Sequence, residues 1–249
     1  MAHQKSIFKI EGTLDGVTFY KSQDGYLIRT KGGVDGNRIK TDPRFARTRE
    51  NGMEFKAAAQ AGKLLRNTIR SLMQNGKDSR VTSRLTQVMS KVLKQDTSSF
   101  RGMRAPAVGV NTANGKALLK MFNFNDAAVM TSILFKPYTV DTTTGVIEIT
   151  DLIPTSDILV PEGATHFSIS GAMQVINFAT KYFDLKRTNV ENNVISPSPV
   201  NITLTPTALP TGTGIKLFYL KVEFFQEVNG NQYPLRNGAF NSLMIIEVV

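Results

Sequence analysis

The carboxyl-terminal half of the chain is divided into short β-branched and aromatic runs by turns rich in Pro, Gly and Asn. This pattern restricts the fold more than any other feature, because several short strands joined by such turns are typical of an antiparallel β-sandwich. The final run, "LMIIEVV", is apolar to the last residue, so we expect it to be buried in its own sheet or against a neighbouring molecule. The predicted strands are 129–140, 145–153, 165–171, 173–185, 200–206, 214–228 and 241–249.

Two helical patterns precede this half, over residues 43–75 and 78–95. Asp42-Pro43 is a helix start and Asn75-Gly76 a helix end. With residues placed 100° apart, the first helix gathers one apolar face from Phe55, Ala58, Ala61, Leu65, Ile69 and Leu72. The apolar stripe of the second helix is Val81, Leu85, Val88 and Val92. Together they predict a helical hairpin over residues 43–95.

The first 31 residues predict a small β-meander with strands at "SIFKI", "VTFYK" and "YLIRTK", and Asp24-Gly25 indicates a tight hairpin. Three short strands enclose too little core to be stable alone, so they should pack on something else. The Gly-rich, basic stretch 32–42 is expected to be a connector without helix. The stretch "SSFRGMRAPAVGVNTANGK" is expected to contain a linker and the domain boundary.

We therefore predict an α+β protein with an N-terminal β-meander, a basic helical hairpin and a C-terminal antiparallel β-sandwich. The first domain would cover residues 1–110, with the meander at 5–31, the connector at 32–42, the hairpin at 43–95 and the linker at 96–110. The β-sandwich domain would cover residues 111–249.

Charged residues, like the predicted helices and strands, are distributed unevenly along the chain. Residues 1–120 hold 23 Lys and Arg against 9 Asp and Glu, whereas residues 121–249 hold 7 against 11. Opposite signs on two parts of one chain make attraction between copies plausible, and a basic surface can also bind a polyanion. A solvated helix face is the third interpretation of the same residues. The basic face is predicted to consist of Arg49, Lys56, Lys63, Arg66, Arg70, Arg80, Arg84 and Lys91.

The residue types and their spacing give little support for an enzymatic function. The chain has no Cys, and its two histidines, His3 and His166, stand far apart in the sequence. "GVNTANGKA" departs from a phosphate-binding loop, because five residues separate its glycines and Ala117 stands where Ser or Thr would reach magnesium. Asp141, Glu148, Asp151 and Asp157 have the pattern of turn and solvent-face residues. We predict no enzyme, no cofactor and no metal.

The first 70 residues resemble an uncharacterised protein family found in Bacteroidota genomes and their phages. Members begin with a Gly-flanked β-hairpin, followed by a basic stretch and a helix that starts at Asn/Asp-Pro-Arg. Asp42 stands here in place of the commoner Asn, and the β-rich remainder aligns less clearly. The family brings no established activity, and therefore no catalytic residues and no ligand. The matching positions are Gly12, Gly16, Val17, Phe19, Tyr20, Arg29, Pro43, Arg44 and Arg49.

The resemblance and the composition together suggest a building block of a virion, tail or filament, by analogy of fold alone. We expect a non-enzymatic structural protein that self-associates into a homo-oligomer. A sequence-independent nucleic-acid-binding protein that uses the basic helices is the alternative. The amino-terminal residues lack the apolar core of a secretory signal, and no window is apolar enough for a membrane span. A soluble cytoplasmic protein, free or incorporated into a released particle, is therefore expected.

Overall fold

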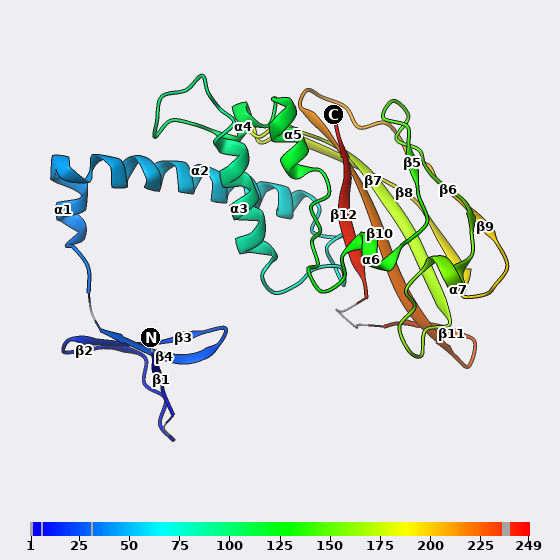
Figure 1. Ribbon diagram of the computed structural model, residues 1–249, viewed down its shortest axis with the longest axis horizontal. Coiled ribbons are helices and arrows are strands. Elements are labelled where there is room, and N and C mark those ends of the chain that lie inside the picture. Colours follow the sequence, from blue (N-terminus) through cyan, green and yellow to red (C-terminus); the bar gives the residue numbers. More distant parts are fainter. Residues whose placement is uncertain (1, 6, 31, 236–239) are drawn as a thin grey trace. The chain divides into compact units, whose positions relative to one another are not determined.

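The computed structural model describes residues 2–5, 7–30, 32–235 and 240–249 (Figure 1). The chain forms two compact units, which divide between Arg49 and Glu50. Both helices and antiparallel sheets are present, so the predicted α+β class is confirmed. The division lies near residue 50 rather than at 110/111, because the helices after Glu50 share one hydrophobic core with the β-rich half.

The first unit contains a four-stranded antiparallel sheet in the order β1-β4-β3-β2, as the predicted meander requires. Strands at "VTFYK" and "YLIRT" are confirmed, and Lys31, the last residue of the second predicted run, lies outside the described residues. A strand at "SIFKI" is wrong. Ile7 and Phe8 of that run lie outside any strand, with 96% and 80% of their surface exposed, and Ser6 lies outside the described residues. The strands are β1 (Ala2–His3), β2 (Gly12–Leu14), β3 (Val17–Ser22) and β4 (Gly25–Thr30).

The connector contains a helix that the sequence analysis did not expect. Helix α1 (Gly36–Thr41) begins after Asp35, whose carboxylate accepts a hydrogen bond from the backbone N–H of Asn37. Asp42 then accepts from the backbone N–H of Arg44 and caps the short helix η1 (Pro43–Phe45). Side-chain caps at both points supply the acceptors that free helix N–H groups need, which offsets the low helix propensity of this stretch. Helix α2 (Ala46–Thr68) follows directly.

Two long helices dominate the helical layer of the second unit. α3 (Val81–Leu93) crosses α2 steeply (Figure 1), and Leu85 and Met89 lie against Gly62 at the crossing. α2 ends at Thr68, before the predicted end at 75, and Ile69 and Leu72 enter the core from the turns that follow it.

The stretch expected to be a linker is packed structure. It contains α4 (Pro106–Gly109) and α5 (Ala113–Leu119). A Cβ at Gly109 would lie 2.0 Å from the carbonyl oxygen of Val92, and one at Gly115 would lie 1.9 Å from that of Gly109. The glycines therefore allow close backbone approach, and their interpretation as linker punctuation is wrong.

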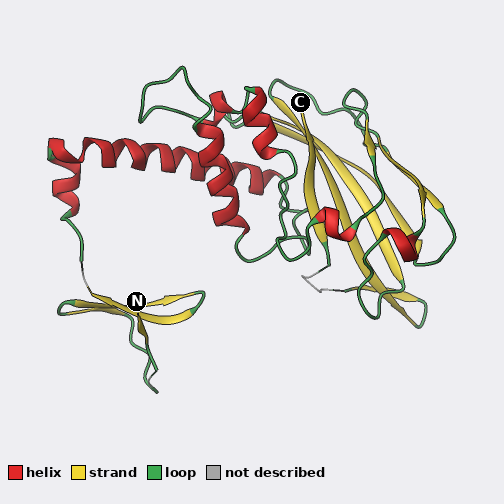
Figure 2. Cartoon of the chain, viewed as in Figure 1, coloured by secondary structure: helices red, strands yellow, loops and turns green. Residues whose placement is uncertain are grey.

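The β-rich half forms two antiparallel sheets (Figure 2). The predicted strand at 129–140 is instead a helical turn followed by a two-residue strand, and residues 166–176 form one strand where two were expected to meet. The five-stranded sheet contains β7 (His166–Ile176), β8 (Phe183–Val194), β10 (Ile215–Val228), β11 (Asn231–Pro234) and β12 (Ser242–Val248). The three-stranded sheet contains β5 (Thr139–Val140), β6 (Ile147–Leu152) and β9 (Val200–Leu204). The helical turns α6 (Met130–Ile133) and α7 (Pro154–Asp157) lie in the connections.

The second unit has three layers, with the five-stranded sheet in the middle. Leu217 and Tyr219 of β10 belong to the core shared with the helices, while Phe218 and Leu220 belong to the core shared with the three-stranded sheet. Successive residues of a strand point to opposite faces, so the helices and the small sheet cover opposite sides. The apolar strand β12 is buried within this sheet, paired with β10 on one edge and hydrogen-bonded on the other to residues 121–124.

Candidate interaction surfaces

Two of the predicted basic residues, Lys56 and Lys63, lie on the solvent side of α2, and Arg70 follows in the turns after the helix ends at Thr68. Lys56, Lys63 and Arg70 are exposed, and the buried side of the helix contains Ala58, Ala61 and Leu65. At 100° per residue Lys56 and Lys63 lie on the side of the helix opposite these buried residues.

Five of the eight predicted residues make no hydrogen bond or ion pair through their side chains within the described part of the chain. Four of them are exposed, so their charges are available to another molecule or to solvent, whereas Arg66 is half-buried and its Nε is shielded from solvent. We call this set the basic helical surface: Lys56, Lys63, Arg66, Arg70 and Lys91.

Arg49 belongs to the first unit and has an internal role. Its Nη1 donates to the carbonyl oxygens of Ile39 at 2.8 Å and Asp42 at 2.9 Å. These bonds satisfy carbonyls at the carboxyl end of α1, where an arginine is also favoured by the helix dipole. Arg49 therefore stabilises the turn from α1 into α2 and is not part of the basic helical surface.

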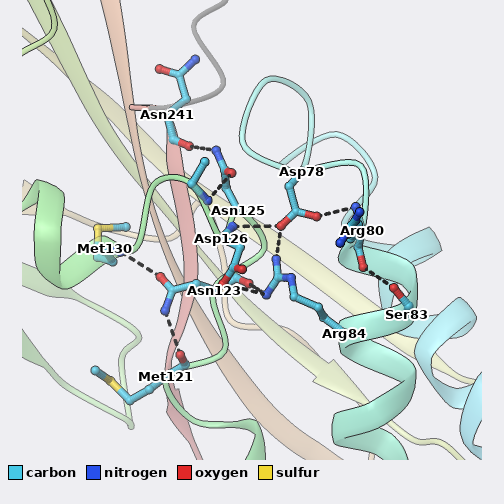
Figure 3. Close-up of polar contacts among 11 residues, drawn as sticks. Asp78, Arg80, Ser83, Arg84, Met121, Asn123, Asn125, Asp126, Met130 and Asn241 are labelled. Atoms are coloured by element: carbon cyan, nitrogen blue, oxygen red, sulfur yellow. Dashed lines mark hydrogen bonds and ion pairs between the residues drawn. The ribbon is translucent and has the colours of Figure 1, made fainter. Parts of the chain in front are cut away.

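Arg84 is also used internally, as Figure 3 shows. Its guanidinium forms an ion pair with Asp78, donates to the carbonyl of Asn123 at 2.8 Å and lies 4.0 Å from a carboxylate oxygen of Asp126. The same group stacks over the ring of Phe122, 5.3 Å from its centroid. These contacts attach the start of α3 to the segment that borders β12.

Asp78 is the centre of this network (Figure 3). It accepts from the backbone N–H groups of Arg80 at 2.6 Å and Asp126 at 2.9 Å, besides its ion pair with Arg84. Burial alone would raise the pKa of Asp78, but these hydrogen bonds and the positive charge outweigh it and lower the pKa. The carbonyl of Arg80 accepts from the Ser83 hydroxyl, so Arg80 takes part in the same helix start.

The acidic residues among the helices are neutralised within the fold. Glu50 pairs with Arg101 at 3.2 Å, and Glu54 with Arg104 at 2.8 Å. Asp96, only 2% exposed, accepts hydrogen bonds from the loop that follows it. With Asp78 paired as well, these are all four acids of residues 50–104. The positive surface is therefore not cancelled by carboxylates among them.

The apolar face predicted for α2 is wrong at its first residue. Phe55 is 63% exposed, and its neighbour Glu54 is buried instead. Glu54 accepts from the backbone N–H of Gly102 at 2.7 Å and from Arg104, and the hydrogen bond from Arg104 is the largest influence that lowers its pKa. Glu54 precedes Ala58 and Ala61 by four and seven residues, so helical periodicity places it on the apolar face, and the loop before α4 supplies the partners of its carboxylate.

A shallow cleft of about 360 Å³ extends the basic helical surface. Lys63 lines it together with Lys181, which belongs to the turn between β7 and β8. Leu64 and Phe178 supply apolar lining. Lys181 was missed by the sequence analysis, because nothing in the sequence brings residue 181 near a helix 118 residues earlier.

The opposite side of the second unit is acidic. Residues 137–180 and 188–215, which contain the whole three-stranded sheet, hold six Asp and Glu and no Lys or Arg. Hydrogen bonds from Thr144 and Thr143 lower the pKa of Asp141, which favours its charged form. We call the exposed carboxylates without a cationic partner in the described structure the acidic sheet surface: Asp141, Glu148, Asp151 and Glu162.

The sheet of the first unit has one apolar face that is not fully buried by the described residues of that unit. Residues directly opposite on paired antiparallel strands share a face, as do residues two apart on one strand. The strand register therefore places five apolar side chains together, and we call them the apolar sheet face: Leu14, Val17, Phe19, Tyr26 and Ile28. None is buried, and the one buried side chain described in the unit, Leu27, lies on the other face.

The described residues contain no group of three His, Cys, Asp or Glu that could hold a metal ion. His166 lies 3.4 Å from Glu227, an ordinary surface pair. The segment that resembles a phosphate-binding loop forms the end of α4 and the start of α5. Nor is any described helix long and apolar enough to cross a membrane.

Comparison with known protein families, with characterised proteins and with solved structures finds no match to this chain.

Proposed function

We propose that this chain is a non-enzymatic structural protein that self-associates, as a building block of a virion, tail or filament. The observation that carries the proposal is the apolar sheet face of the first unit. A small sheet needs a second layer on its apolar face to be stable, and the unit buries one side chain among its described residues. A second copy of the chain is the proposed cover.

Burial of this face would favour association. Removing five apolar or aromatic side chains from water stabilises by roughly 1 kcal/mol or more each, since all but Leu14 are already part-buried within the sheet. Lys9 and Lys21 lie near the ring of Tyr26, with their Nζ atoms 5.5 Å and 5.7 Å from its centroid. Positive charges at the margin of the face would restrict how two copies approach.

The test is light scattering coupled to size-exclusion chromatography, over a range of protein concentrations. The wild type should form a defined oligomer, and the double variant Phe19→Glu/Ile28→Glu should be a monomer. Thr18→Glu, a matched change on the other face, should keep the oligomer. An unchanged melting profile of the second unit would show that the variants remain folded there. A wild-type monomer at every concentration would overturn the proposal.

Polyanion binding is the second candidate, and the five basic side chains without internal partners favour it. Such binding would be independent of sequence and would weaken steeply with salt, because each neutralised phosphate releases counterions. Protein purified without nuclease would carry nucleic acid, and Lys56→Ala, Lys63→Ala and Arg70→Ala would each reduce the salt dependence by about one unit of log–log slope. An absence of co-purified nucleic acid and of salt-dependent binding would count against it.

A further inference from the structure

Two oppositely charged surfaces lie on opposite outer sides of the second unit. Alternate residues of β10 face the helices and the three-stranded sheet, so these two layers are separated by the full thickness of the five-stranded sheet. The basic helical surface belongs to the helix side and the acidic sheet surface to the other. They therefore cannot meet within one copy of this unit.

The charge of neither surface is neutralised by residues of its own layer. All four acids of residues 50–104 are held by arginines or backbone N–H groups, which leaves Lys56, Lys63 and Arg70 without carboxylate partners in the described structure. On the other side, the strands and connections of the three-stranded sheet supply no Lys or Arg at all from residues 137–180. The basic helical surface thus has an excess of positive charge, and the acidic sheet surface an excess of negative charge.

An open hollow on the acidic side has room for the end of a cationic side chain. Asp141 and Glu148 line one open hollow of about 410 Å³, together with threonines of β5 and of the β5–β6 turn. Lysine and arginine have long side chains whose charged ends would reach into such a hollow, while their stems cover the threonine methyl groups. Lys56 and Lys63 of α2 provide two such side chains about two helical turns apart, and Arg70 provides a third beyond the end of the helix.

We propose that the acidic sheet surface of one copy binds the basic helical surface of the next copy. This inference rests on the proposed self-association and names a second contact for it. Since the two surfaces are different patches, the contact is head-to-tail, and repeated contacts would form a ring or a filament. Two equal surfaces would repel each other, so the symmetric pairings of this unit are disfavoured. Salt weakens this contact, whereas it does not weaken the contact of the apolar sheet face.

The experiment uses sedimentation velocity on the full chain at about 0.01 M and about 1 M salt, where the Debye length falls from about 30 Å to about 3 Å. Two variants reverse one surface each: Lys56→Glu/Lys63→Glu/Arg70→Glu, and Glu148→Lys/Asp151→Lys. Each alone should lose the salt-sensitive association by roughly tenfold or more in dissociation constant. An equal mixture should recover it, because the acidic sheet of the first variant meets the basic helices of the second.

A control triple variant, Lys5→Glu/Lys40→Glu/Arg44→Glu, changes net charge equally in the first unit and should associate like the wild type. Salt-independent association that neither reversal alters would overturn this inference and leave the apolar sheet face as the contact. A wild-type monomer at both salts would overturn the proposed function as well. Loss of nucleic-acid binding in the first variant, with association unchanged, would also overturn it and favour the polyanion role.

Discussion

Substitution of Asp96 by Asn should destabilise the second unit strongly, although the two side chains have the same shape. One carboxylate oxygen accepts from the backbone N–H groups of Ser98 and Ser99, at 3.1 Å and 3.0 Å, and from the Ser98 hydroxyl at 2.9 Å. The other accepts from the backbone N–H of Ala105 at 3.1 Å. Asn has a single acceptor oxygen, so its amide group must face one of these donors.

The expected loss of stability follows from the geometry of these hydrogen bonds. A buried N–H without an acceptor costs about 1–3 kcal/mol, and hydrogen bonds to a neutral oxygen are weaker than those to a carboxylate by about 1 kcal/mol. Asp96→Asn should therefore lower the free energy of unfolding by about 2–4 kcal/mol. For a unit of this size the midpoint of thermal unfolding should fall by roughly 4–16 °C.

The pH dependence provides an independent check. Burial alone would raise the pKa of Asp96, but hydrogen bonds from Ser98, Ser99 and Ala105 outweigh it and hold the pKa well below the usual range. A lowered folded-state pKa contributes stability above the unfolded value of about 3.9, and that stability is lost as pH falls towards the folded pKa. The wild-type advantage over the variant should shrink by about 1 kcal/mol between pH 7 and pH 3.

Urea unfolding of both proteins at pH 7 and pH 3 measures these quantities. A difference below about 0.5 kcal/mol at pH 7 would refute the assigned role, since ordinary surface substitutions produce changes of that size. A difference that does not change with pH would refute the assignment of the lowered pKa to Asp96.

Three further outcomes test the packing and the division of the basic residues. Arg84→Ala should cost about 2–3 kcal/mol of unfolding free energy, whereas Lys91→Ala should stay within about 0.5 kcal/mol, as chemical denaturation would show. Gly62→Ala should stabilise by about 0.5–1 kcal/mol, because a Cβ there lies 3.6 Å from Leu85 and α2 gains helix propensity. Gly109→Ala should cost more than about 3 kcal/mol in the same assay, since its Cβ would overlap a backbone carbonyl; equal melting temperatures for the two alanine variants would contradict this packing.

Local patterns predicted most of the secondary structure. Helix α3 and the strands β6, β9, β10 and β12 follow the apolar periodicity of their sequences, because each buries one or both faces against a core. The predictions failed where a distant segment supplies the partners of a side chain. Glu54 has the helical spacing of the buried face of α2, but a carboxylate is not expected there. The loop that supplies its hydrogen-bond partners lies 48 residues later, and no pattern within α2 identifies those partners.

The candidate surfaces were predicted only in part. The set of basic residues came from sequence, but the distinction between Arg84, which is held inside the fold, and Lys91, which is exposed, required their partners to be known. The apolar sheet face was hidden for a related reason. Leu14 and Ile28 join Phe19 on one face only through strand register, which the sequence does not specify by itself.

The sequence alone determined the α+β class, the alternation of short strands and turns in the β-rich half, and the opposite net charges of the two parts of the chain. These are local properties, since side-chain period and residue type are independent of what lies far away in the chain. Tertiary structure decided which charges are neutralised and on which side the remainder lies. That outcome depends on which layers cover the central sheet, and only the packed fold establishes that the basic helices and the acidic strands lie on opposite sides of it.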